Sequence, residues 1–171
     1  MVAMLKGDND KTVSVNNIPE QSNMPEERNT NMRNLSFKQQ NLKLSEIAAY
    51  NNDAQKIIYE DGTVYIGDVT DNMKHGKGKL MDPKGDTYEG DFEEDKIQGK
   101  GKFTGADGTI YEGDWHDGQQ HGFGKETWAD GSNYSGYYKG GVKHGDGKYH
   151  WADGSAYSGN WVNGNIEGYV G

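Results

Sequence analysis

The sequence predicts an all-β protein: an elongated antiparallel sheet of stacked 23-residue β-hairpin repeats, preceded by a mostly disordered N-terminal arm. Three observations predict this fold. Residues recur at a fixed period, glycine and aromatic residues alternate within each period, and the chain is polar, with 32% hydrophobic residues and a mean hydropathy of −1.04. A period between about 20 and 50 residues indicates an array whose units stabilise one another by stacking.

The repeat is marked by a tyrosine that recurs every 23 residues (88 − 65), with a glycine two places after each tyrosine. The tyrosines are Tyr65, Tyr88, Tyr111, Tyr134 and Tyr157. The array is expected to occupy residues 55–171, as a leading half unit, four full hairpins and a truncated last unit.

The segment before the array, residues 1–54, does not follow the repeat. Its first part is rich in Asn, Glu, Ser and Pro and has few large apolar residues, so it cannot bury enough surface to offset chain entropy. We expect a disordered or extended arm. Leu44 and Ile47, with Ser45 as a candidate N-cap, predict a short helix near residues 45–52.

Each unit is expected to form a hairpin. In residues 111–115, alternation places Tyr111, Gly113 and Trp115 on one face of a strand. Asp117-Gly118 then supplies a turn that needs positive φ, and residues 122–125 form the return strand. In the preceding unit the same reasoning assigns the turn to Asp95-Lys96. An Asp-Gly pair turns the chain into the next hairpin, as at Asp130-Gly131.

The strand glycines predict how the units hold together. A glycine inside a strand weakens it but lets a ring approach the backbone closely. Aromatic side chains lying over bare glycine backbone would therefore replace a second layer of structure.

The segments "YEGDFEEDKIQGKGKFTGADGT", "YEGDWHDGQQHGFGKETWADGS" and "YSGYYKGGVKHGDGKYHWADGS" closely resemble the membrane occupation and recognition nexus (MORN) repeat. The end units depart from its pattern, with Val69 at an aromatic position and Gln55 and Val170 at glycine positions. The resemblance implies a non-catalytic module. It also implies a cytoplasmic protein associated with the cytoskeleton or a cilium, because proteins of similar repeat content are often of that kind.

The aromatic face is the predicted partner site. A single-layer sheet cannot cover both faces, so part of this surface is expected to stay open as a groove for a helix or peptide of another protein. The alternative is that glycine stacking uses the rings entirely. The groove residues are Tyr65, Tyr88, Phe92, Tyr111, Trp115, Tyr134, Tyr138, Tyr157 and Trp161.

A lysine ladder, Lys79, Lys102, Lys125 and Lys148, is expected on the opposite face. Acidic residues on neighbouring strands favour cross-strand ion pairs, and contact with anions such as phosphoinositide headgroups is the alternative. The chain carries a net charge of −9. An acidic surface disfavours nucleic acid and does not favour a membrane.

No residue pattern predicts catalysis, a metal site or a cofactor. The repeated Gly-x-Gly-Lys lacks the spacing of a phosphate loop, and the histidines His75, His121 and His144 are too far apart in an array to share one metal ion. We therefore expect a non-enzymatic scaffold or assembly subunit. The alternatives are a peripheral phosphoinositide-binding module and a regulatory subunit of an enzyme on another chain. An open C-terminal sheet edge would also favour self-association.

Overall fold

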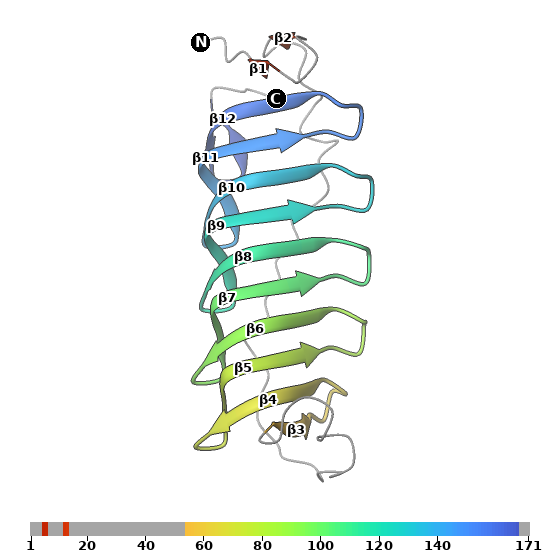
Figure 1. Cartoon of the computed structure of the whole chain (residues 1–171), viewed down its shortest axis with the longest axis vertical. Coiled ribbons are helices and arrows are strands. Elements are labelled where there is room, and N and C mark those ends of the chain that lie inside the picture. The colour runs from red at the N-terminus through yellow and green to blue at the C-terminus, as the bar shows by residue number, and fades with distance from the viewer. Residues whose placement is uncertain (1–4, 7–11, 14–53, 168–171) are drawn as a thin grey trace.

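A computed structural model describes residues 5–6, 12–13 and 54–167, and within them all regular structure is β-sheet. One 11-stranded antiparallel sheet runs in sequence order from β3 to β13, so every strand pairs with its neighbours in the chain (Figure 1). The predicted all-β fold, an elongated sheet of stacked hairpins, is confirmed.

The sheet begins with a lone strand, β3, and continues as five hairpins. The strands are β3 (Gln55–Ile58), β4 (Val64–Thr70), β5 (Met73–Met81), β6 (Thr87–Glu93), β7 (Lys96–Thr104), β8 (Ile110–His116), β9 (Gln119–Thr127), β10 (Asn133–Lys139), β11 (Val142–His150), β12 (Ala156–Val162) and β13 (Asn165–Ile166). In the last hairpin the return strand β13 has two residues.

Two-residue turns with positive φ join the strands of each hairpin. Asp117 and Gly118, for example, have φ of 50° and 75°. In the second hairpin the turn residues are Glu94 and Asp95, with φ of 47° and 70°. The prediction of Asp95-Lys96 was wrong by one position, because Lys96 already begins β7.

The tip of each of the last four hairpins is hydrogen-bonded to the unit before it. The backbone N–H of Gly118 donates a hydrogen bond of 3.0 Å to the carbonyl of Ile97, one unit earlier. The same bond recurs from Asp95 to Lys74 (3.0 Å), from Gly141 to Gln120 (3.0 Å) and from Gly164 to Lys143 (2.8 Å). Each of these four tips therefore links two units as well as forming a turn.

The turns between hairpins also repeat one geometry. The N–H of Trp128 donates to the carbonyl of Ser132 at 3.0 Å, and the Asp130 carboxylate accepts the Ser132 N–H at 2.8 Å. An aspartate that accepts a backbone N–H two residues later stabilises a tight turn in which glycine takes positive φ. Gly131 has φ of 87°.

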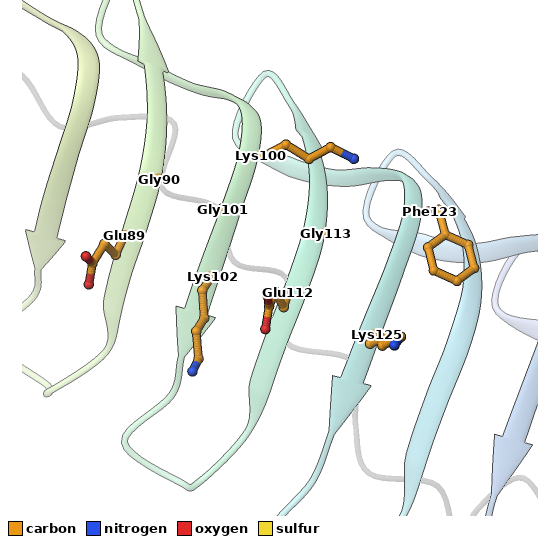
Figure 2. Close-up of a pocket in the computed structure, with 9 residues that line it drawn as sticks. All are labelled: Glu89, Gly90, Lys100, Gly101, Lys102, Glu112, Gly113, Phe123 and Lys125. Carbon is orange, nitrogen blue, oxygen red and sulfur yellow. The ribbon is translucent and has the colours of Figure 1, made fainter.

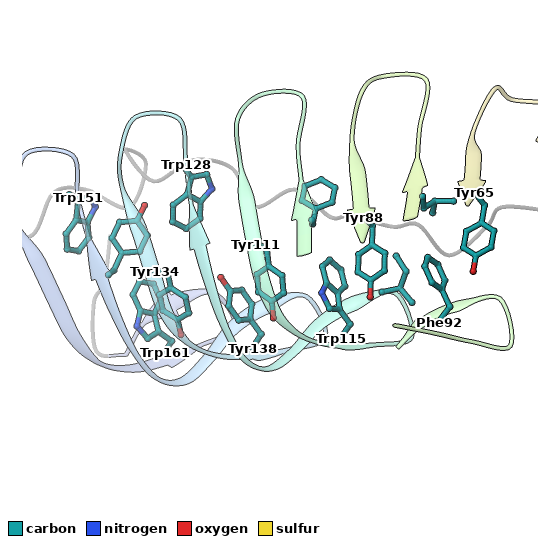
Figure 3. Close-up of a cluster of buried hydrophobic side chains, with 14 of the residues drawn as sticks. Tyr65, Tyr88, Phe92, Tyr111, Trp115, Trp128, Tyr134, Tyr138, Trp151 and Trp161 are labelled. Atoms are coloured by element: carbon teal, nitrogen blue, oxygen red, sulfur yellow. The ribbon is translucent and has the colours of Figure 1, made fainter. Parts of the chain in front are cut away.

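A bulge bends the first strand of each full hairpin. In the first hairpin, for example, the register of β4 with the return strand β5 shifts between Gly67 and Val69, at Asp68. The Asp68 carboxylate accepts the N–H of Lys77 on the return strand at 3.0 Å. Bulges increase local bending, and the ribbons curve beneath the aromatic side chains (Figure 3).

Within the N-terminal arm, β1 (Leu5–Lys6) and β2 (Thr12–Val13) pair antiparallel. The remainder of the predicted arm, including the expected helix near residues 45–52, lies outside the described residues.

Candidate functional site

Tyrosine rings cover the glycines of the sheet, as expected. The Tyr111 ring lies over Gly113 and Gly124, which are partners across β8 and β9, and a Cβ added at Gly124 would approach that ring closer than 3.0 Å. The Tyr111 hydroxyl donates to the carbonyl of Asp114 at 2.8 Å. The same bond, to the residue three places later, is made by Tyr65 (2.7 Å), Tyr88 (3.0 Å), Tyr134 (3.0 Å) and Tyr157 (3.2 Å).

Four places after each of the last four tyrosines, an aromatic residue joins neighbouring units edge to face. The Tyr88 ring contacts Phe92 and Trp115, each at 5.2 Å between centroids. Tyr111 likewise contacts Trp115 at 5.1 Å and Tyr138 at 5.2 Å. Each such pair stabilises the fold by about 0.5–1.5 kcal/mol beyond area burial. These contacts form one row of rings along the array (Figure 3).

The row is buried. Its nine predicted groove residues are 0–3% exposed. The expectation that part of this ring surface stays open was therefore wrong. The rings of neighbouring units contact each other across the bent strands, and this ring-to-ring packing uses much of the surface that was expected to stay open. Contact of these residues with a partner remains a prediction.

Sequence reasoning missed several residues that complete this face. Leu80, Phe103 and Tyr149 share one repeat position on the return strands, and Trp128 and Trp151 share another in the turns. All five are buried. The 23-residue period could have identified them, because each set recurs in step with the tyrosines.

Charged side chains are also buried on the aromatic face. Lys74 Nζ lies 3.0 Å from the Tyr59 hydroxyl and 3.1 Å from Asp95 Oδ1. The Tyr138 hydroxyl donates to Glu126 Oε2 at 2.6 Å.

Lys143 is also buried, and its Nζ lies 5.0 Å, 5.4 Å and 5.9 Å from the ring centroids of Trp128, Tyr134 and Trp161. These distances are typical of cation–π contacts, which stabilise a desolvated ammonium.

Burial changes the acidity of the tyrosines in this row. It raises the pKa of Tyr88 far above its ordinary value, and the nearby Asp91 carboxylate adds to the effect. The pKa of Tyr111 is raised in the same way, by burial first and then by Asp114 and Glu126. Both phenols therefore stay protonated above their ordinary pKa of 10.0.

The lysine ladder lies on the outer face, where register sets its neighbours. Lys102 stands directly between Glu89 on β6 and Glu112 on β8. The ion pairs seen on this face, however, join other residues: Lys77 pairs with Asp91, and Lys100 pairs with Asp114. The first three ladder lysines face glutamates in register, whereas Lys148 faces serines. Asp91 and Asp114, at the bulges, pair with a second set of lysines that the prediction omitted.

A shallow hollow of about 510 Å³ lies on the outer face over β6 to β9 (Figure 2). Lys100, Lys102, Glu89 and Glu112 line it, and Phe123 and Lys125 form its end towards the C-terminal units. The bare backbone of the glycines lies between these side chains (Figure 2).

Phe123 and Tyr137 form an exposed aromatic pair beside the hollow. They are direct partners across β9 and β10, their ring centroids lie 5.7 Å apart, and they are 43% and 51% exposed. The equivalent cross-strand partners two units and one unit earlier are the ion pairs Lys77–Asp91 and Lys100–Asp114. At this cross-strand position, the ion pairs of the earlier units are therefore replaced by two exposed rings between β9 and β10.

No group of three or more His, Cys, Asp or Glu in residues 5–6, 12–13 and 54–167 is placed to hold a metal ion. The same part of the chain contains no helix that is long and apolar enough to cross a membrane.

Comparison with known families gives one match. The family model described as "MORN repeat" matches residues 65–87, 88–110, 111–133, 134–156 and 157–169. Each match begins at a tyrosine of the buried row. No curated protein matches the chain.

Proposed function

Because this chain belongs to the MORN repeat family, whose repeats are non-catalytic modules that bind proteins or membranes, we propose that it is a scaffold that binds a helix or peptide of another protein. The proposed contact surface is the outer face around Phe123 and Tyr137. The aromatic face, with its rings buried, is assigned to holding the units together.

The exposed Phe123–Tyr137 pair is the observation that supports this proposal. Large exposed aromatic residues on a sheet face are typical of partner sites. Each ring offers roughly half of its 150–250 Å² to a partner, so covering both would contribute on the order of 4 kcal/mol before the costs of association. An exposed ion pair at the same position would contribute about 0–1 kcal/mol to the stability of the fold.

The cellular setting is part of the proposal. We place the scaffold in the cytoplasm, in a cytoskeletal or ciliary assembly, and this rests on the family resemblance alone. Pairing between the sheet edges of two copies, at β13 or β3, would extend the array and suits an assembly subunit.

A charge-for-ring exchange tests the contact surface. The double variant Phe123→Lys, Tyr137→Asp installs the ion pair that neighbouring units use, so the sheet should keep its stability. The unaltered chain is first used to enrich a partner from native extract. We expect the variant to recover at least tenfold less of that partner. Thermal unfolding and circular dichroism check that the fold is kept.

The matched control moves the rings instead of removing them. A quadruple variant adds Lys77→Phe and Asp91→Tyr to the exchange, which restores the overall composition and places the aromatic pair two units earlier. Capture should stay lost. Recovery of capture would mean that any exposed ring pair is sufficient, and it would overturn the proposed site.

A further inference from the structure

We propose that Lys125, Ser135 and Lys148 form an anion-binding cradle that receives an acidic side chain of the bound segment. An apolar side chain two residues away in that segment then packs on Phe123 and Tyr137. The inference rests on the proposed function and specifies the chemistry of the partner.

Strand register places the three residues side by side. Ser135 on β10 is the direct partner of Lys125 on β9 and of Lys148 on β11. Directly paired residues have Cβ atoms about 4.5–5.5 Å apart, so two ammonium groups can reach one anion over the serine hydroxyl. Lys125 and Lys148 are exposed, and Ser135 is partly exposed.

The residues beside the lysine ladder differ in charge along the array. Lys102, in the middle of the array, has a glutamate on both sides, Glu89 and Glu112. At the two later equivalent positions the chain carries Ser135 and Ser158. Lys148 therefore has a serine on either side, and Lys125 has Ser135 on one side and Glu112 on the other. Lys125 and Lys148 thus share Ser135 with no acidic residue in register between them, and the nearest acid on β11 is Asp146, two residues before Lys148.

The cradle and the aromatic pair share two strands. Phe123 and Lys125 are two residues apart on β9, and Ser135 and Tyr137 are two residues apart on β10. Alternation puts such residues on one face of a strand, roughly 7 Å apart. Alternate side chains of an extended peptide have the same spacing. The matching ligand is an acidic residue, any residue and then an aromatic or large aliphatic residue, in either direction.

Charge favours a peptide over a membrane or a nucleic acid. The array from residue 55 to residue 171 has 12 Lys and no Arg against 20 Asp and Glu, a net charge of −8. A membrane or a nucleic acid is an extended polyanion, and the excess of acidic residues around the cradle would repel it. A peptide brings only one carboxylate or phosphate, for which two lysines are sufficient.

Peptide binding by the full chain tests the cradle. The probe is a fluorescent nine-residue peptide of Gly and Ser with a central Asp-Ser-Phe, compared with Asn-Ser-Phe and Asp-Ser-Ser versions. We expect the Asp-Ser-Phe peptide to bind at least tenfold more tightly than either relative, with an affinity that falls as salt is raised.

Ser135→Glu restores the glutamate of the earlier units and should weaken binding of the Asp-Ser-Phe peptide at least tenfold. Its matched control is Ile66→Glu, which adds the same charge at the equivalent repeat position on β4 and should leave binding unchanged. Equal binding by Ser135→Glu and the unaltered chain would overturn the cradle.

The remaining outcomes also decide. Failure of the Asp-Ser-Phe peptide to bind at roughly 1 mM, a free energy weaker than about −4 kcal/mol, would overturn the inference. So would binding of phosphoinositide-containing vesicles that Ser135→Glu abolishes, because it would assign the lysines to lipid. In both cases the exchange at Phe123 and Tyr137 still tests the proposed function separately, since it alters no cradle residue.

Discussion

At the scale of single residues, this protein depends on the absence of side chains. The glycine pair Gly113 and Gly124 leaves a space that the Tyr111 ring fills, and the ring in turn donates its hydroxyl to the backbone. A strand glycine is usually a weakness. Here the glycine provides the space in which a ring packs, so the tyrosine and its glycines act together.

Gly124→Ala should lower the free energy of unfolding by about 3 kcal/mol, since the added Cβ would collide with the Tyr111 ring. Gly131→Ala is the control for backbone strain, with φ of 87° and no atom within 4 Å of its added Cβ, and should cost about 1 kcal/mol. Urea denaturation measures both. Gly124 does not have positive φ, so a loss no larger than that of Gly131→Ala would contradict the predicted collision with the ring.

At the scale of the element, each hairpin depends on two turn residues with positive φ. Asp117-Gly118 and Gly140-Gly141 contain glycine, whereas the second hairpin uses Glu94-Asp95. Asp95 has a reason to stay, because its carboxylate accepts the N–H of Lys74 at 2.8 Å and contacts its ammonium. Glu94 is exposed and gains little in return for its strained backbone.

Glu94→Gly should therefore stabilise the protein by about 0.5–1 kcal/mol, because glycine adopts φ of 47° without steric cost. Glu93→Gly, one residue earlier and inside β6, should destabilise it by a similar amount. Thermal unfolding of the two variants provides the comparison. A lower melting temperature for Glu94→Gly would contradict the argument.

At the scale of the whole molecule, the buried tyrosine row should make stability sensitive to alkali. Tyr88 and Tyr111 have raised pKa values in the folded state, whereas unfolded tyrosine ionises near its ordinary pKa of 10.0. Above that pH the unfolded chain loses protons that the folded chain keeps, so stability is complete below about pH 10 and falls as pH rises further.

At pH 11 each of these two tyrosines should reduce the free energy of unfolding by about 1.4 kcal/mol relative to pH 8. Urea midpoints measured across this range at constant ionic strength test the prediction. A midpoint that does not change between pH 8 and pH 11 would mean that the phenols ionise in the folded protein.

The sequence was sufficient for the architecture because the 23-residue period links each tyrosine to its glycines. It was insufficient for features that depend on register or bending. The turn at Glu94-Asp95 was misplaced because residue preference was followed in place of the repeat frame. Asp71, the first turn residue of the first hairpin, lies one 23-residue period before Glu94 and identifies the position. The closed ring row depends on how the bulges bend the strands. The Phe123–Tyr137 contact joins residues on two strands, and only the pairing of those strands reveals it.

The bond from the tip of each of the last four hairpins to the preceding unit has an evolutionary consequence. Since every joint is built from the same pair of backbone groups, a whole 23-residue unit can be duplicated or deleted without inventing a new junction. Descendants of this chain can thus gain or lose length in steps of one repeat. Inserting one unit before the aromatic patch would carry that patch about two strand widths, near 10 Å, further from the leading end.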